Sequence, residues 1–267
     1  MVRSTTQSSS SIWFRLESWA VMVLTFNFSF LILTCGLDIE DSTPPSAPRW
    51  VKKSYPEEWP ERGIDANEVG GIILEWKSNP INENIARYYI YRYENFHLND
   101  SLGEYELIEQ LEVEMFSDMK YIDISAEIGN IYKYQIRAQD VAENLGDPSD
   151  SKIYSLLQPI GSEMMSPNGR EHPIGYDRVL SWHYYYLNTM ENYILTIVNS
   201  QHELITRIVL QPGNYFNGDE QWQIPATVDL ISGEVYKWRI DVGAMYSEGR
   251  ETAGSESLWA TFLYLDE

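Results

Sequence analysis

The chain has 267 residues, of which 43% are hydrophobic and 22% are charged, a balance that is typical of globular domains and excludes a wholly disordered chain. Its 19 basic and 40 acidic residues give a formal net charge of −21 at pH 7, so we expect no nucleic-acid partner, because phosphate backbones are repelled by such a surface. The single cysteine excludes an internal disulfide and any cysteine-based metal site.

An apolar run from Trp19 to Thr34 follows a Ser-rich stretch that carries Arg3 and Arg15. The run is shorter than the roughly 20 residues of a membrane-spanning helix, and it fits the hydrophobic part of an export signal. The only cysteine, Cys35, stands where the run ends. We therefore predict a signal peptide over 1–34, with an uncleaved anchor helix as the alternative. Both interpretations attach the chain to a membrane.

The segment Ile32-Leu33-Thr34-Cys35 resembles the processing site of bacterial lipoproteins, although Thr34 stands where that family usually has Gly or Ala. The resemblance implies cleavage before Cys35, lipidation of its thiol and a place in the bacterial cell envelope. Gly36 after the cysteine is compatible with the outer membrane. Residues 35–48 are rich in Asp, Ser and Pro, and they are expected to form a short acidic tether rather than a core.

Alternation of apolar and polar residues predicts strands over 72–77, 88–93, 105–111 and 132–138. Similar landmarks return roughly 105 residues later, which indicates an internal repeat. Trp182 corresponds to Trp76, and Tyr236 to Tyr132. The spacing is too long for a solenoid unit and fits a β-sandwich of about 100 residues. We predict an all-β chain with two tandem sandwiches over 49–157 and 158–267, whose cores contain Trp76, Tyr132, Trp182, Tyr236 and Trp238.

The first repeat resembles the fibronectin type III family. The resemblance covers 43–157 and rests on these motifs: Pro44-Pro45-Ser46-Ala47-Pro48, Leu74-Glu75-Trp76, the run Tyr88 to Arg92 and the run Tyr132 to Asp140. The second unit resembles the family more loosely, through Leu180-Ser181-Trp182 and the run Leu230 to Ile240. Because of its long loop around 211–218, a merely immunoglobulin-like sandwich is the alternative for this unit. The resemblance implies that the hydroxyls of Tyr132 and Tyr236 bond to backbone at a corner between sheets.

No zinc-protease, nucleophile-elbow, phosphate-loop or dinucleotide motif is present. The histidines are His97, His172, His183 and His202. The acids around Trp59 are expected to be solvated, and the acids and amides of 214–220 lack the EF-hand spacing. We therefore predict no catalytic residue, no cofactor and no metal, so the chain is not predicted to be an enzyme. An enzyme with a site between the two units, near His183 or His202, is the alternative.

A candidate binding face follows from the alternation in the first unit. If Tyr88 and Ile90 point inward, their neighbours Tyr89, Tyr91 and Tyr93 point outward. In the fibronectin-like layout, the neighbouring strand adds its own outward residues. The predicted face therefore consists of Tyr89, Tyr91, Tyr93, Lys133, Gln135 and Arg137. Tyr and Arg are common in binding hot spots, although Tyr–Arg pairs also stabilise exposed sheets.

The predicted role is non-catalytic presentation of the sandwiches for adhesion, docking or spacing, with an unknown protein or glycan partner. The alternative is a carbohydrate-binding accessory module that uses exposed aromatic side chains. More aromatic residues follow in the second unit, at 183–186 and in the region expected to be a long loop. There, Tyr215, Phe216 and Trp222 are expected either to close the base of the second sandwich or to border a ligand.

Overall fold

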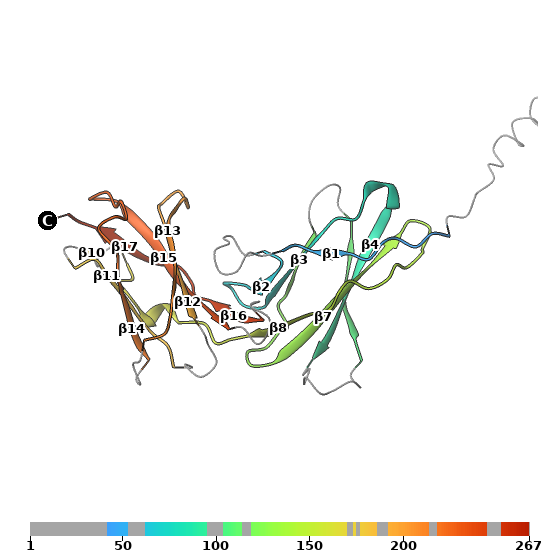
Figure 1. The fold of residues 1–267 in the computed structure, drawn as a ribbon, viewed down its shortest axis with the longest axis horizontal. Coiled ribbons are helices and arrows are strands. Elements are labelled where there is room, and N and C mark those ends of the chain that lie inside the picture. The colour runs from blue at the N-terminus through green and yellow to red at the C-terminus, as the bar shows by residue number, and fades with distance from the viewer. Residues whose placement is uncertain are drawn as a thin grey trace, which may run out of the picture. The chain divides into compact units, whose positions relative to one another are not determined.

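The computed structural model describes residues 42–52, 62–94, 104–113, 119–169, 173–174, 177–185, 192–213, 218–244 and 252–266. Regular structure in these residues is β-strand, apart from two 3₁₀ turns, η1 (Ile81–Glu83) and η2 (Ser162–Met164). The fold is all-β, as the sequence predicts (Figure 1). Within the described part of the chain, no helix is long and apolar enough to span a membrane. Cys35 and the predicted signal and tether up to residue 41 lie outside it.

The first sandwich packs two sheets against each other. One sheet is built on β3 (Ile72–Lys77), which pairs with β6 (Met119–Asp123) along one edge and with two short strands along the other. These are β1 (Arg49–Trp50) and β2 (Ile64–Ala66). The opposite sheet has the strand order β5-β4-β7-β8. Its strands are β4 (Ile85–Glu94), β5 (Glu106–Glu112), β7 (Ile131–Asp140) and β8 (Lys152–Leu156).

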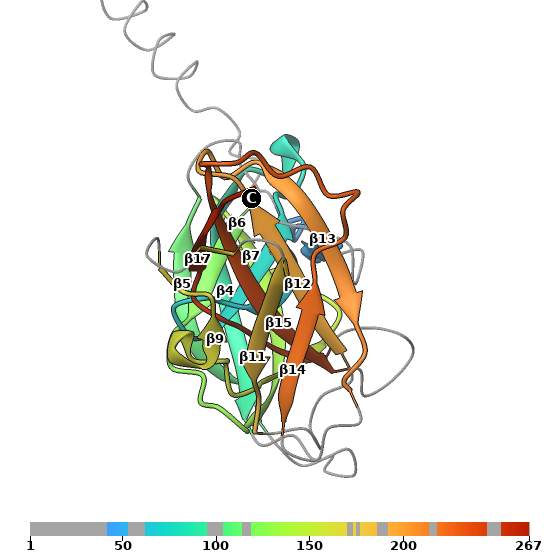
Figure 2. The same cartoon turned by 90° about the vertical axis from the view of Figure 1, so that its left-hand side faces the viewer.

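The second sandwich repeats this plan with small changes. Its three-stranded sheet has the order β14-β11-β9, with bounds β9 (Met165–Ser166), β11 (Val179–His183) and β14 (Asp219–Gln223). In the opposite sheet β12 (Asn192–Val198) pairs with β13 (Leu204–Leu210) and with β15 (Val235–Ala244). The last strand is divided into β16 (Ala253–Glu256) and β17 (Ala260–Tyr264), and β10 (Pro173–Ile174) adds to β17 in parallel. Figure 2 shows β11 beside β14 and β12 beside β13.

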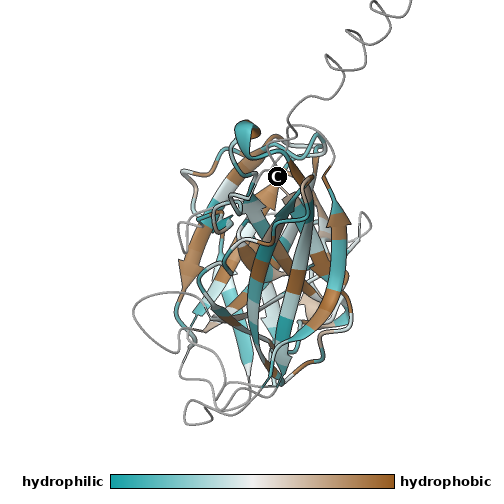
Figure 3. Cartoon of the chain, turned by 90° about the vertical axis from the view of Figure 1, so that its right-hand side faces the viewer, coloured by the Kyte–Doolittle hydropathy of each residue, from teal (hydrophilic) through white to brown (hydrophobic). Residues whose placement is uncertain are grey.

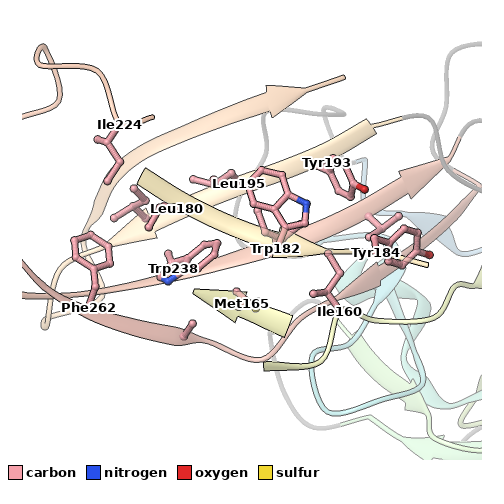
Figure 4. Packing of buried hydrophobic residues seen from close by; sticks show 14 of the residues in the cluster. Ile160, Met165, Leu180, Trp182, Tyr184, Tyr193, Leu195, Ile224, Trp238 and Phe262 are labelled. Atoms are coloured by element: carbon pink, nitrogen blue, oxygen red, sulfur yellow. The ribbon is translucent and has the colours of Figure 1, made fainter. Parts of the chain in front are cut away.

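Each sandwich encloses its own hydrophobic core, and apolar and polar residues alternate along its strands (Figure 3). In the first core, Trp76 is completely buried and meets the ring of Tyr88 edge-on, with 5.4 Å between centroids. In the second core, Trp182 is only 3% exposed and lies between Tyr193 and Trp238, at centroid distances of 5.3 and 6.5 Å (Figure 4). Each indole of this kind buries roughly 150–250 Å² of surface, so the two tryptophans dominate their cores.

Several strands were not predicted from the sequence, among them β6, β13 and β14. β6 and β14 are short, and β13 has apolar residues of both parities, so none shows a clean alternation. The expectation that Trp222 lies in a loop is wrong, because it belongs to β14 and packs partly buried against the second core. Asp219 and Glu220, expected in the same loop, also lie in β14. Tyr215 and Phe216 are outside the described residues.

Strands of the two repeats also pair with each other. The edge of β8 pairs in parallel with β16, so that Ser155 lies opposite Ala253 and Leu156 opposite Gly254. The carboxylate of Glu68, in the turn after β2, accepts a 3.0 Å hydrogen bond from the indole of Trp259 and lies 3.7 Å from Arg239. Period-2 patterns cannot reveal this sharing of a sheet, because they indicate which face of a strand is buried and not which strand lies beside it.

Candidate functional site

The predicted binding face lies on adjacent strands of the first sandwich. In the antiparallel pairing of β4 with β7, Tyr89 is opposite Arg137, Tyr91 is opposite Gln135 and Tyr93 is opposite Lys133. These side chains are partly exposed, whereas their neighbours Tyr88 and Ile90 are buried in the core. Because directly opposite residues share one face of a sheet, the pairing gathers the predicted residues on one surface. We call this surface, with Tyr105, the outer face.

Hydrogen bonds and ring contacts fix the outer face in one conformation. The Tyr89 hydroxyl donates to Gln139 Oε1 at 2.8 Å, and Arg137 Nε donates to the carbonyl of Gly146 at 2.8 Å. Gln135 Nε2 donates to Ser151 Oγ at 2.9 Å. Such bonds hold side chains that would otherwise lose rotamer entropy when a partner binds.

Tyr105 belongs to the same face and was not singled out from the sequence as part of it. Its hydroxyl shares a 3.0 Å hydrogen bond with Ser151, and its ring lies edge-on to Tyr93 with 6.3 Å between centroids. The ammonium of Lys133 stands 5.9 Å from the centre of the Tyr105 ring, within reach of a cation–π attraction. Its place in the sequence could have indicated this role, because Tyr105 immediately precedes β5 (Glu106–Glu112), the strand that pairs with β4.

The predicted core residues occupy the interior of the two sandwiches. The hydroxyl of Tyr132 accepts a hydrogen bond from the backbone N–H of Glu127, and that of Tyr236 from Ile231, both at 2.8 Å. The indole of Trp238 donates to the carbonyl of Pro167 at 2.9 Å. By contrast, the buried indole nitrogen of Trp76 has no hydrogen-bond partner among the described residues.

A buried carboxylate in the first sandwich has a structural role. Asp123, at the end of β6, accepts hydrogen bonds from Ser125 at 2.7 Å and from Arg92 and Tyr134 at 2.8 Å. Burial by itself would raise the pKa of Asp123, but the bonds from Ser125, Arg92 and Tyr134 outweigh it and lower that pKa. This carboxylate is fully satisfied and stays ionised, so nothing about it points to acid–base chemistry.

The two histidines that the structure describes do not gather at one site. His183 ends β11 and pairs through Nδ1 with Asp219 Oδ1 at 2.7 Å, whereas His202 lies in the β12–β13 turn with its Nε2 2.8 Å from Lys237. The two therefore belong to opposite sheets of the second sandwich. Among the residues that the structure describes, no group of His, Cys, Asp and Glu could hold a metal ion. His97, His172 and the acids around Trp59 lie outside those residues.

No family model and no curated protein matches this sequence. Among solved structures, the chain is similar to the FN1-FN3 domains of chicken CNTN1, with 16% sequence identity and a TM-score of 0.28. The match covers 84% of this chain and 68% of the contactin chain. The assignment of a tandem sandwich rests on the strand order and pairing described above.

Proposed function

We propose that the protein is a non-catalytic lipoprotein of the bacterial cell envelope that docks a protein partner on the outer face of its first sandwich. The observation that carries the proposal is the row of partly exposed tyrosines on β4 beside Lys133 and Arg137 on β7. Tyr and Arg are the residue types that supply most binding energy in protein interfaces. Their internal hydrogen bonds make this surface ready to bind without rearrangement.

A protein partner fits the outer face better than a glycan does. Tyr89, Gln135 and Arg137 already direct polar atoms at other groups of the same sandwich. The groups that remain available to a partner are mainly the tyrosine rings, Leu107 and the charge of Lys133. Leu107 belongs to β5, lies opposite Tyr91 and is 43% exposed. Apolar area with a few cations suits a protein hot spot. Sugar hydroxyls, in contrast, need several hydrogen-bonding groups that point at the ligand.

The proposed anchor is lipid on Cys35, followed by the acidic, Pro-containing segment up to residue 48. Acyl chains contribute about 0.8 kcal/mol per buried CH₂, and two chains hold a protein stably to a membrane. A tether of this composition extends from the surface and gives the sandwiches reach. This placement predicts that Cys35→Ser releases the protein from membranes, and intact-mass measurement of the mature chain identifies the lipid and the new N-terminus.

The docking proposal is tested by photo-crosslinking in intact cells. A photoreactive amino acid replaces Tyr91 in the full-length chain, and a matched control replaces the exposed Leu258 of the second sandwich. We expect Tyr91 to crosslink to one protein species and Leu258 not to, and Arg137→Glu to abolish that crosslink. Equal crosslinking at the two positions, or none at Tyr91, would overturn the outer face as the docking surface.

A further inference from the structure

The second sandwich has a hollow of about 460 Å³ beside β11 and β14, which is within the roughly 300–1,000 Å³ of small-molecule sites. Most of the residues that line it are polar, and they are Met164, Ser181, Trp182, His183, Asp219, Glu220 and Gln221. We call it the β11–β14 hollow. It belongs to a different sandwich from the outer face, so an inference from it stands independently of the docking proposal.

The strand register explains why these polar groups meet. β11 and β14 are antiparallel, with Ser181 opposite Gln221 and His183 opposite Asp219. The residue between Ser181 and His183 is Trp182, which points into the core. Because alternate residues point to opposite faces and directly opposite residues share a face, these two pairs form two adjacent rows on the outside of the sheet.

An exposed aromatic ring stands next to this polar group. Tyr185 is 69% exposed, and its ring meets that of His183 edge-on with only 4.1 Å between centroids. His183 in turn is held by Asp219 at 2.7 Å. An ionised carboxylate only accepts hydrogen bonds, so Nδ1 of His183 donates this one. Asp219 therefore orients the imidazole, and the imidazole supports Tyr185 in an exposed position.

The backbone at the edge of the hollow requires glycine. Gly218, which precedes β14, has φ of +79°, and a Cβ there would collide with the carbonyl oxygen of Tyr184. The N–H of Tyr184 donates to the carbonyl of Gly218 at 2.9 Å. Glycine is the residue that adopts this conformation without strain, and it lets β14 begin close enough to β11 for Asp219 to reach His183.

The hydrogen-bonding character of the lining selects a ligand class. Gln221 can both donate and accept, the hydroxyl of Ser181 donates to the carbonyl of Ser166 at 3.3 Å and can still accept, and the carboxylate of Asp219 accepts. A sugar hydroxyl also does both, so it is complementary to this mixture. An anion would meet the carboxylate of Asp219, and a simple cation could not accept hydrogen bonds from the side-chain amide of Gln221. An exposed tyrosine ring adds an apolar surface of the size of a pyranose face.

We propose that the β11–β14 hollow binds a neutral saccharide, with one pyranose ring on Tyr185 and its hydroxyls bonded to Ser181, Asp219 and Gln221. The predicted consequence is that the second sandwich binds glycan while the outer face of the first binds protein. The test uses the purified full-length chain in detergent micelles and an array of neutral oligosaccharides of glucose, galactose, mannose and N-acetylglucosamine, followed by calorimetry on those that bind.

We expect saturable binding of at least one of these oligosaccharides. Tyr185→Ala should weaken it about tenfold, since it removes the stacking surface. Gln221→Ala should weaken it about threefold to tenfold, the usual cost of one hydrogen bond. Leu258→Ala is the control, because it shortens an exposed apolar side chain of the same sandwich outside the lining of the hollow, and it should leave saccharide affinity unchanged. Unaltered melting temperatures of the variants show that the fold is intact.

Three results would overturn the proposal. The first is that no oligosaccharide of the array binds. The second is binding that Tyr185→Ala and Gln221→Ala both leave unchanged, which places the glycan elsewhere. The third is that choline or a lysine-rich peptide, run as cationic probes, binds in a Tyr185-dependent way while no saccharide does. If Tyr185→Ala is unstable, the saccharide affinity of Gln221→Ala decides whether the hollow is the binding site, because the side chain of Gln221 is exposed and its removal should not disturb the fold.

Discussion

Two buried carboxylates, one in each sandwich, show how the same fold gives different chemistry. Asp123 lies in β6, the strand that pairs with the Trp76 strand, and Glu220 lies in β14, which pairs with the Trp182 strand. They are 1% and 8% exposed. Burial disfavours the charged form of both, because the interior solvates a carboxylate poorly.

The two sites differ in what compensates for burial. Asp123 receives hydrogen bonds from Ser125, Arg92 and Tyr134, and its pKa is lowered. For Glu220, burial raises the pKa, and the 2.8 Å hydrogen bond from the backbone N–H of Gly213 opposes this only in part. Burial raises the pKa of the neighbouring Tyr193, and the negative charge of Glu220 raises it further. A carboxylate with several hydrogen-bond donors is stable in its charged form, whereas one that is buried with a single donor is stabilised in its neutral form.

The largest expected effect comes from the two core tryptophans. Trp76→Ala and Trp182→Ala should each lower the free energy of unfolding by about 3–5 kcal/mol, since each leaves a large cavity. Denaturant unfolding followed by circular dichroism measures this loss. Tyr185→Ala, at an exposed aromatic of the second sandwich, should change it by less than about 0.5 kcal/mol. A wild-type unfolding curve for either tryptophan variant would contradict the core assignment.

The second-largest expected effect is a loss of stability when Asp123, the carboxylate with three side-chain donors, is neutralised. Asp123→Asn keeps the shape of the side chain but removes the closer of the two carboxylates that Arg92 pairs with, Asp123 at 2.8 Å, and leaves Glu94 at 3.6 Å. Because hydrogen bonds to charged groups contribute about 1.5–3 kcal/mol, we expect a loss of about 2–3 kcal/mol in unfolding free energy. Asp147→Asn, at an exposed position of the same sandwich, is the control and should cost almost nothing. A loss no larger than that of the control would mean that the network does not stabilise the fold.

A third prediction concerns a feature that the two sandwiches share. Tyr132→Phe and Tyr236→Phe each remove a hydroxyl that accepts a backbone N–H at 2.8 Å. Each should lower the unfolding free energy by about 1 kcal/mol, the usual worth of one such bond. Since the backbone bond has the same length in both repeats, the losses should agree apart from the contribution of the longer, 3.3 Å bond that Tyr132 also accepts from Asn130. Chemical denaturation measures both losses. Clearly unequal values would show that the tyrosine hydroxyl contributes more to stability in one sandwich than in the other.

The smallest effect is a pH dependence of opposite sign at the two carboxylates. The lowered pKa of Asp123 means that its contribution to stability is complete above the unfolded value of about 3.9 and is lost as the pH falls through its folded-state pKa. The raised pKa of Glu220 means that its contribution is present below the unfolded value of about 4.3 and is lost as the pH rises through the folded-state pKa.

Glu220→Gln tests this difference. The variant should be more stable than the wild type at neutral pH, by less than about 1 kcal/mol, and the advantage should fade in acid, because the wild-type carboxyl is then neutral as well. Melting temperatures between about pH 3 and about pH 7 measure it. Asp123→Asn should show the reverse, with its deficit largest at neutral pH. Parallel pH profiles for the two variants would remove the distinction between the sites.

Much of the fold is visible in the sequence. The alternation around Trp76, Tyr88 and Tyr132 predicts which face of each strand is buried, because side chains on a strand point to opposite sides in turn. The outward set Tyr89, Tyr91 and Tyr93 follows from the same rule. The candidate binding face could therefore be assembled from the sequence, once neighbouring strands were assumed from the family resemblance.

The β11–β14 hollow could not be found in this way. Its residues come from segments around 182 and 220, and the second segment was expected to be a loop. Only the register of β11 on β14 brings His183 opposite Asp219 and places Glu220 opposite the buried Trp182. Strand faces follow from local sequence, because the backbone itself alternates. Strand partners and buried charges are decided by packing between distant segments, and that choice appears only in the tertiary structure.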